Sequence, residues 1–451
     1  MATAVARGLR TSAREHTRTT MSDFTSGRAM ASRYAAWALL NLLVAGPALG
    51  LLSAYDATTD GGLSLQYPIF NTHAWMTLMG WCVPVLFALV YWLLPVLKES
   101  SARLGAVPGL SLVLLVLGNI GLAAYLFLAH NLRPALFVLP MVWGAFLVAG
   151  ILYAATVSRL TIRTLRPTAT DLGLQAGSVW LLVILAVRCA VALGALATGR
   201  HDFLASSEPA IRYAMLFGFI ANTGLALAAA IVPPFLGTPH PRAMALTSFR
   251  IYNGAIGIWC GGAAWVLPYP YSWGRLLLVL AGFAFVYAVL RLLVDLRLFA
   301  LLTATSQTTR RLLTRTALAT GAIVMLAAAL VIALLSIWAA ATLHPPPPQM
   351  LALPMHLMAV GLFSNLVLAM YIPICGSRSM ASIKGFLAWG AYVMLTAWLI
   401  GKVGLAVSTI IADDVMWRER YFAGWAVGGG MAFLALWLAA ALRPVRRTDD
   451  A

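Results

Sequence analysis

Long apolar runs recur along the whole chain and constrain its fold more than any other feature. A helix that spans a membrane needs about 20 mostly apolar residues. Runs of that kind, between charged or Pro- and Gly-rich breaks, predict twelve helices at 34–55, 72–96, 106–129, 135–157, 173–198, 212–235, 251–267, 275–296, 317–341, 354–374, 386–411 and 421–441. With 61% hydrophobic and 10% charged residues among 451, the chain holds more apolar side chain than a water-soluble fold can bury. We therefore expect an all-α polytopic membrane protein in a lipid bilayer.

The formal net charge of +17 is explained by membrane topology. If the N-terminus lies inside, 23 of the 31 Lys and Arg fall on inner segments and six on outer loops, as the positive-inside rule requires. We thus predict a multi-pass protein of the cytoplasmic (inner) membrane with both termini cytoplasmic, and no nucleic-acid partner. The expected parts are a basic, disordered tail at 1–33, a single twelve-helix membrane domain at 34–441 and a cytoplasmic tail at 442–451.

Three of the predicted helices share a spacing of small residues that indicates an internal repeat. They are the second, sixth and tenth helices, and they align on Gly80, Gly218 and Gly361. Successive glycines are 138 and 143 residues apart, which is four predicted helices each time. The spacing predicts three pseudo-equivalent four-helix units. Small residues at helical spacing are also typical of ordinary packing between membrane helices, so that alternative stays open.

Two of the seven histidines stand two or three residues inside helices that run from outside to inside. They are His73 and His356, and we expect both near the outer face at similar depth. Imidazole is the commonest metal ligand and the usual axial ligand of haem iron. Two imidazoles at one depth on different helices could therefore hold a haem edge-on between them. The alternative is that each histidine sits at the interface and bonds water or a carbonyl group.

The sequence around His73 resembles the second helix of haem-copper oxidase subunit I, with one proline three turns after the histidine and another near the inner end. The run Pro354–Gly361 resembles the tenth helix of that family, in which a His-x-His pair precedes a glycine. By its spacing to that glycine, His356 matches the second histidine of the pair. The resemblance implies a subunit I-like fold of twelve helices in three arcs, and one haem b with His73 and His356 as axial ligands of its iron.

Other side chains are candidates to hold the same cofactor. Arg418 ends the run Val415–Arg418, which resembles the outer segment whose arginines bind haem propionates in that family. The remaining candidates are Arg133 and Arg212 at the predicted outer face, Arg188 in the middle of the fifth predicted helix, and Trp75, which could line a haem face. A guanidinium suits a carboxylate such as a propionate. The alternatives are that the arginines anchor or snorkel to an interface and that Trp75 belongs to an aromatic belt.

The departures from the family point to a narrower function. The histidine that binds the high-spin haem is replaced by Pro354, and the predicted helices 212–235 and 251–267 lack the copper-binding histidines. Copper therefore has no matched ligands, and oxygen reduction is not expected. A closer resemblance is to the divergent NnrS-type haem-binding membrane proteins, which are associated with nitric-oxide stress. It implies a role in nitric-oxide stress response or membrane electron transfer, with a redox protein or quinol as partner. Assembly as a homo-oligomer is left open.

Two other functions remain as alternatives. A catalytic subunit of a terminal oxidase or nitric-oxide reductase would need the metal ligands that are not matched. Twelve helices suit a haem-free permease. Three repeated units do not, and neither does the lack of an acidic residue in the middle of the predicted spans, where ion-coupled relays usually place one.

Overall fold

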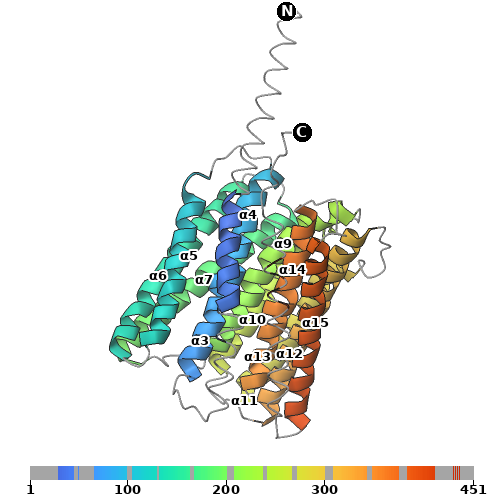
Figure 1. The fold of residues 1–451 in the computed structure, drawn as a ribbon. Helices are drawn as coiled ribbons and strands as arrows, with labels where there is room; N and C mark the ends of the chain where they lie inside the picture. The colour runs from blue at the N-terminus through green and yellow to red at the C-terminus, as the bar shows by residue number, and fades with distance from the viewer. Residues whose placement is uncertain are drawn as a thin grey trace, which may run out of the picture.

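The chain folds into an all-helical bundle, as the apolar runs predict (Figure 1). The computed structural model describes residues 29–44, 49, 66–98, 104–128, 132–162, 167–200, 208–236, 241–266, 272–299, 308–342, 348–374, 383–411, 430, 432, 434 and 436, and no strand occurs among them. Eight helices in these ranges are long and apolar enough to cross a membrane. The tail expected at 442–451 and nearly all of that at 1–33 lie outside the described residues.

The helical elements follow one another along the chain in a simple order. They are the helical residues 29–44, then α3 (Gln66–Met76), η2 (Thr77–Cys82), α4 (Val83–Leu97), α5 (Val107–Leu128), α6 (Leu132–Thr161), α7 (Ala169–Thr198), α8 (Glu208–Tyr213), η4 (Ala214–Ala221), α9 (Asn222–Leu236), α10 (Ala245–Val266), α11 (Ser272–Asp295), α12 (Thr309–Thr342), α13 (Pro348–His356), η6 (Leu357–Leu362), α14 (Phe363–Ile374) and α15 (Ile383–Ile411). Three η segments are π-helical and continue an α-helix on both sides. We call the three resulting continuous helices, α3–η2–α4, α8–η4–α9 and α13–η6–α14, the central rods.

The eight candidate spans match eight of the twelve predicted helices. Three further predictions fall on helical residues that are not among the eight: the first on 29–44, the seventh on α10 and the eleventh on α15, whose apolar part is shorter. The prediction placed the start of α10 at 251, six residues after its first residue, Ala245. Except for four positions, the twelfth predicted helix lies outside the described residues.

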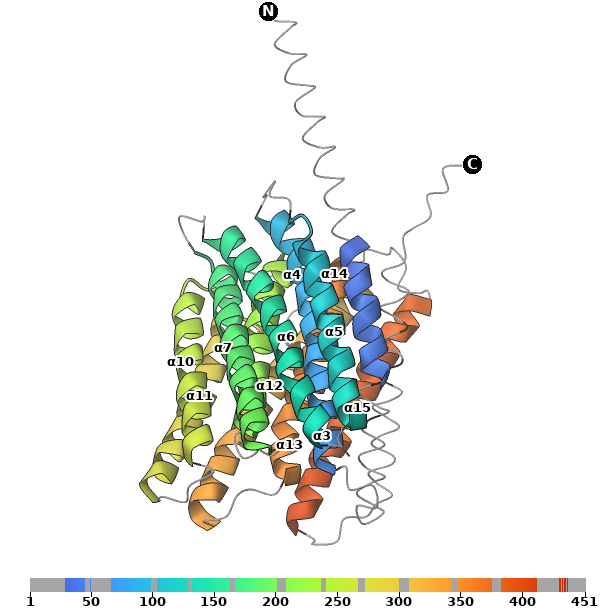
Figure 2. The ribbon, with the colours of Figure 1, turned by 90° about the vertical axis from the view of Figure 1, so that its left-hand side faces the viewer.

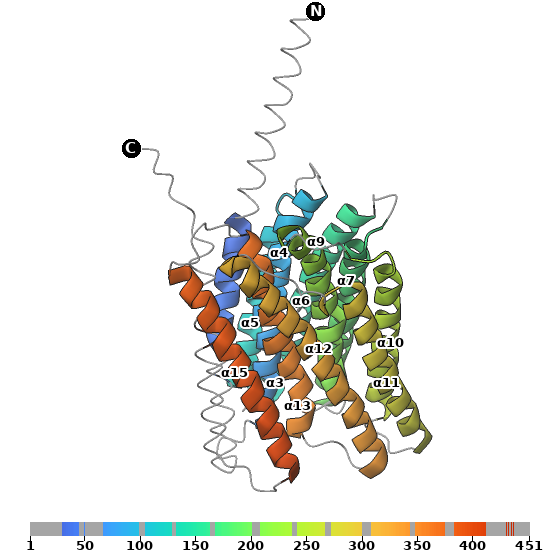
Figure 3. The same ribbon diagram turned by 90° about the vertical axis from the view of Figure 1, so that its right-hand side faces the viewer.

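The central rods form the core of the bundle. The most apolar stretches of the three rods are 94%, 89% and 72% buried, against 33% to 56% for those of the other five candidate spans. In Figures 2 and 3, α10 and α11 lie at one edge of the bundle and α15 at the other. The surrounding helices expose large apolar side chains such as Leu117, Phe127 and Ile258. An apolar outer surface of this kind is what contact with lipid requires.

Each central rod contains one of the three aligned glycines inside its π-helical segment. A Cβ atom added at these glycines would come within 2.5–2.6 Å of a side chain on a neighbouring helix: Gly80 meets Asn41, Gly218 meets Trp180 and Gly361 meets Val324. Real Cβ atoms do not approach so closely, so glycine is what lets these helices touch. The partners lie on the helical residues 29–44, on α7 and on α12, respectively.

Replacing one of these glycines is expected to destabilise the bundle. In Gly218→Ala the new methyl group would lie 2.6 Å from Cγ of Trp180, whose indole N–H donates to Asn253 over 2.7 Å and so cannot shift freely. We expect a loss of about 1–3 kcal/mol, as for other overpacked cores. Gly254→Ala is the matched control, because nothing lies within 4 Å of its added Cβ. Thermal unfolding in detergent, followed by circular dichroism, measures both; equal melting temperatures would contradict the close contact.

Candidate functional site

The helices α3 and α13, which carry the two predicted ligand histidines, lie at the same end of the bundle (Figure 1). His73 is in the last turn of α3, and His356 is the last residue of α13. Both side chains are half-buried. The His356 ring lies 5.6 Å from the ring of Trp398 on α15. Each histidine therefore stands just before the π-helical segment of its own rod.

The hydrogen bond of His356 determines its tautomer. Nδ1 of His356 lies 2.8 Å from the carbonyl oxygen of Ala352, one turn earlier in α13. A carbonyl oxygen only accepts, so Nδ1 carries the proton and donates it. The neutral ring then has its lone pair on Nε2. Histidines that bind metal ions generally donate their other ring N–H to a carbonyl or carboxylate in this way.

A buried polar cluster forms around Glu208, the first residue of α8. Its carboxylate pairs with the guanidinium of Arg188 on α7 and lies 3.6 Å from Nη2 of Arg212, one turn later. The indole N–H of Trp75 on α3 donates to the same carboxylate over 3.2 Å. Arg212 also donates to Oδ1 of Asn71 over 2.6 Å. We call these five residues the Glu208 cluster, and all five are buried.

Aromatic rings complete the surroundings of Arg188. Its guanidinium carbon lies 5.0 Å from the ring centre of Trp75 and 4.4 Å from that of Trp143 on α6. The two indoles meet edge to face, with centres 4.9 Å apart. Cation–π contacts are strongest where water is excluded, and Trp75 and Trp143 are fully buried. Arg188 is thus held inside the bundle by a carboxylate and two rings, instead of reaching along apolar neighbours to an interface.

Helix geometry sets the Glu208 cluster apart from His73. Asn71 and Trp75 stand two residues before and two residues after His73 in α3. At 100° per residue, the side chain of His73 leaves the helix about 160° away from both of them. The cluster therefore contacts the face of α3 opposite to the one that carries His73. Of the predicted cofactor residues, the structure brings Trp75, Arg188 and Arg212 together, but on this opposite face.

Two other predicted residues cannot be placed in the same way. Arg133 is in the first turn of α6, and its side chain lies outside the described part of the structure; Arg418 lies wholly outside it. Both remain predictions.

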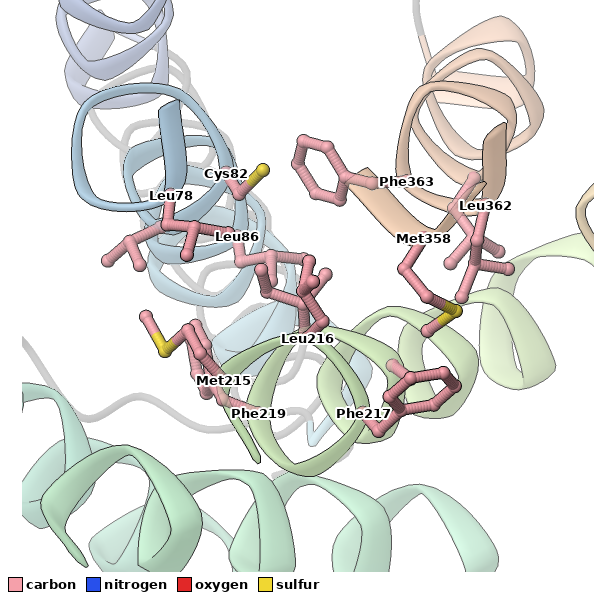
Figure 4. Packing of buried hydrophobic residues seen from close by; sticks show 14 of the residues in the cluster. Leu78, Cys82, Leu86, Met215, Leu216, Phe217, Phe219, Met358, Leu362 and Phe363 are labelled. Atoms are coloured by element: carbon pink, nitrogen blue, oxygen red, sulfur yellow. The ribbon is translucent and has the colours of Figure 1, made fainter. Parts of the chain in front are cut away.

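The centre of the three rods is filled by apolar side chains (Figure 4). Buried side chains from all three rods lie there: Leu78, Cys82 and Leu86 of the first rod, Met215, Leu216, Phe217 and Phe219 of η4, and Met358, Leu362 and Phe363 of the third rod. The Trp81 ring lies 5.7 Å from that of Phe363 and joins the first and third rods edge to face. Among the described residues, no group of three or more His, Cys, Asp or Glu side chains could hold a metal ion.

The sequence prediction missed Glu208, Asn71 and Trp143 as parts of a site. One signal for Glu208 was present: it stands four residues before Arg212, the spacing of an ion pair along a helix. Because it precedes the apolar run predicted at 212–235, the sequence alone places it in an outer loop. Its partner Arg188 belongs to the preceding helix, and no local pattern joins the two.

A scan against protein-family models finds no match for this chain, and neither does a search of curated proteins. The function must therefore be argued from the geometry of the site.

Proposed function

We propose that this is an integral membrane protein that binds one haem b between α3 and α13, with His73 and His356 as the axial ligands. One observation carries the proposal. Two half-buried histidines stand at the same end of two central rods, each just before a π-helical segment. π-Helical turns occur frequently at functional sites. The resemblance of both segments to haem-copper oxidase subunit I and NnrS-type proteins supports the same assignment.

The residues present fit a haem. The Nδ1–H of His356 donates to a carbonyl, so the lone pair is on Nε2, the nitrogen that would bind iron. His73 leaves α3 on the face opposite to the Glu208 cluster, so its imidazole does not compete with Arg188 and Arg212 for the carboxylate. The Trp398 ring beside His356 offers an apolar wall of the kind that surrounds a haem.

The wider fold is inferred to be that of twelve helices in three four-helix units, with both termini cytoplasmic. The close contacts at the three aligned glycines support the units. Each glycine of a second helix is met by a side chain from the helix that would be first in the same unit: the residues 29–44, α7 and α12. The positive-inside distribution of Lys and Arg supports the orientation. A cytoplasmic (inner) membrane is the location that this topology suits.

The bound haem would supply one-electron chemistry. His73 and His356 would fill both axial positions, which favours electron transfer over the activation of a ligand on the iron. The buried apolar side chains at the centre of the rods would keep water from this region. We infer a role in membrane electron transfer or nitric-oxide stress protection, with a redox protein or quinol as electron donor. Arg133 and Arg418 remain candidates to pair with the propionates.

A reduced-minus-oxidised absorption spectrum of the purified protein tests the proposal. We expect a b-type band that His73→Ala and His356→Ala each remove, because each variant deletes an axial ligand. His240→Ala is the matched control, since this histidine lies in a predicted inner loop and should leave the band intact. A protein that carries no haem, or whose band survives both substitutions, would contradict the proposal. A haem-free protein that moves a solute across proteoliposomes would instead be a permease.

A further inference from the structure

We infer that Glu208 is a positioning residue that fixes the rotation of α3 at the turn that carries His73. The inference rests on the proposed function, because the rotation of α3 affects function only if His73 must face a cofactor. It goes beyond that function because Glu208 lies on the other side of α3. It also gives a reason for the buried hydrogen bonds and ion pairs of the Glu208 cluster, which apolar packing alone would not need.

The contacts of the cluster are arranged to resist rotation. The indole N–H of Trp75 donates directly to the carboxylate of Glu208 over 3.2 Å. Asn71 is linked to Glu208 through Arg212, whose Nη2 donates to Oδ1 of Asn71 over 2.6 Å. These two anchors are four residues apart, so they stand one above the other on a single face of α3. A helix held at one point can still turn about its axis, whereas two anchors on one face hold it. Since His73 is midway between them in sequence, its direction is fixed by both.

The position of η2 makes such an anchor useful. The π-helical segment begins at Thr77, four residues after His73, and its hydrogen bonds do not follow the α-helical pattern of α3. α3 and α4 are thus joined by a turn with a different pitch, and contacts of α3 with other helices help to fix its rotation. A metal ligand must be held to within about 10–20° of its productive direction. The Glu208 cluster supplies that constraint from α7 and α8, two elements outside the first rod.

The charge in the cluster argues for a specific role. Arg188 and Glu208 are 3% and 5% exposed, and a buried ion pair is often no more stabilising than apolar side chains of the same size. Arg212 adds a second guanidinium to the same carboxylate. Apolar residues could fill this space, but they would not give Trp75 and Asn71 directional hydrogen bonds. Directional bonds to two residues of one helix face are what a positioning role needs.

The double variant Asn71→Leu/Trp75→Phe tests the inference directly. It cuts both anchors on α3 but leaves the Arg188–Glu208 ion pair in place, so the fold is retained. We expect about tenfold weaker haem binding, the lower end for residues that orient a metal ligand, and a shifted low-spin haem signal in electron paramagnetic resonance. Glu208→Gln should shift the signal in the same sense by less, because its amide oxygen can still accept from Trp75.

Asp171→Ala is the control for general destabilisation, since Asp171 is a buried carboxylate at the other end of α7. It should lower the melting temperature and leave the haem signal unchanged. A signal and an affinity that are unchanged in both Asn71→Leu/Trp75→Phe and Glu208→Gln would overturn the inference. So would an equal shift of the signal in Asp171→Ala.

A second measurement needs no haem and separates the two proposals. Nitroxide labels on His73→Cys/His356→Cys, with the four native cysteines replaced by alanine, report the distance between α3 and α13 by pulsed resonance. We expect one narrow distribution that Asn71→Leu/Trp75→Phe broadens and Asp171→Ala does not. If the protein binds no haem but the distribution broadens, the proposed function fails and the positioning role stands. If the distribution does not change, the positioning role is wrong.

Discussion

Glu208→Leu is expected to lower the free energy of unfolding by about 3–5 kcal/mol, the cost of breaking a buried ion pair by removing one partner. The substitution would leave Arg188 and Arg212, each 3% exposed, buried without the carboxylate that they share. The indole N–H of Trp75 would lose its acceptor as well. Unfolding in detergent by heat or by added sodium dodecyl sulfate measures the change.

The control for this prediction is the double variant Arg188→Leu/Glu208→Leu. It removes both charges of the closest pair, so it should cost clearly less than the sum of the two single substitutions. The difference is the coupling energy between the two side chains. Single effects that simply add would show that the pair does not interact as the structure indicates.

Asp171→Ala is expected to have the second largest effect, about 3 kcal/mol from two lost interactions. Asp171 is fully buried. Its carboxylate accepts from the backbone N–H of Thr168 over 2.9 Å, as half of a capping box at the start of α7. It also pairs with Nζ of Lys98 over 2.5 Å. The alanine variant therefore loses both the cap and the partner of a mostly buried ammonium group.

Thr168→Ala separates the two contributions. It removes the hydroxyl that accepts from the backbone N–H of Asp171 but leaves the Lys98 ion pair, so we expect a loss of about 1 kcal/mol, typical of an N-cap. The two variants should therefore differ by about 2 kcal/mol in the same unfolding assay. If Thr168→Ala costs as much as Asp171→Ala, the ion pair with Lys98 contributes nothing to stability and the cap alone accounts for the loss.

Features of the fold that depend on residues close together in the chain could be predicted from the sequence. Apolar runs of 20 residues indicate helices without any knowledge of their partners, and eight of the predicted twelve are helices able to cross a membrane. The alignment of Gly80, Gly218 and Gly361 identified three positions that all prove to be close helix contacts. Glycine gives this signal because no other residue allows the approach.

The site was predictable only in part, because its contacts join distant segments. The sequence indicates Arg188 as a cation in the middle of a helix and Arg212 as a cation at the outer face, both candidates to bind a propionate. Their shared partner Glu208 is an ordinary acid at the edge of a loop when read along the chain. The opposite orientations of His73 and Trp75 follow from their separation by two residues once α3 is known to be α-helical there. The π-helical turns could not be predicted, although each contains one of the aligned glycines, because a glycine within an apolar run does not distinguish a π turn from an α turn.

The π-helical turns have a consequence for how the rods tolerate insertions and deletions. A π turn closes its hydrogen bond over one residue more than an α turn does, so it is equivalent to an extra residue within the helix. Deleting one residue between Thr77 and Cys82 would let the rod become continuous α-helix. Because the π turn absorbs the extra residue, the segment with His73 would keep nearly its present direction relative to α4. A one-residue deletion within α4, by contrast, would turn that segment by about 100° relative to the residues after the deletion. The π-helical turns are thus places where a rod can lose a residue without turning the imidazole toward a different neighbour.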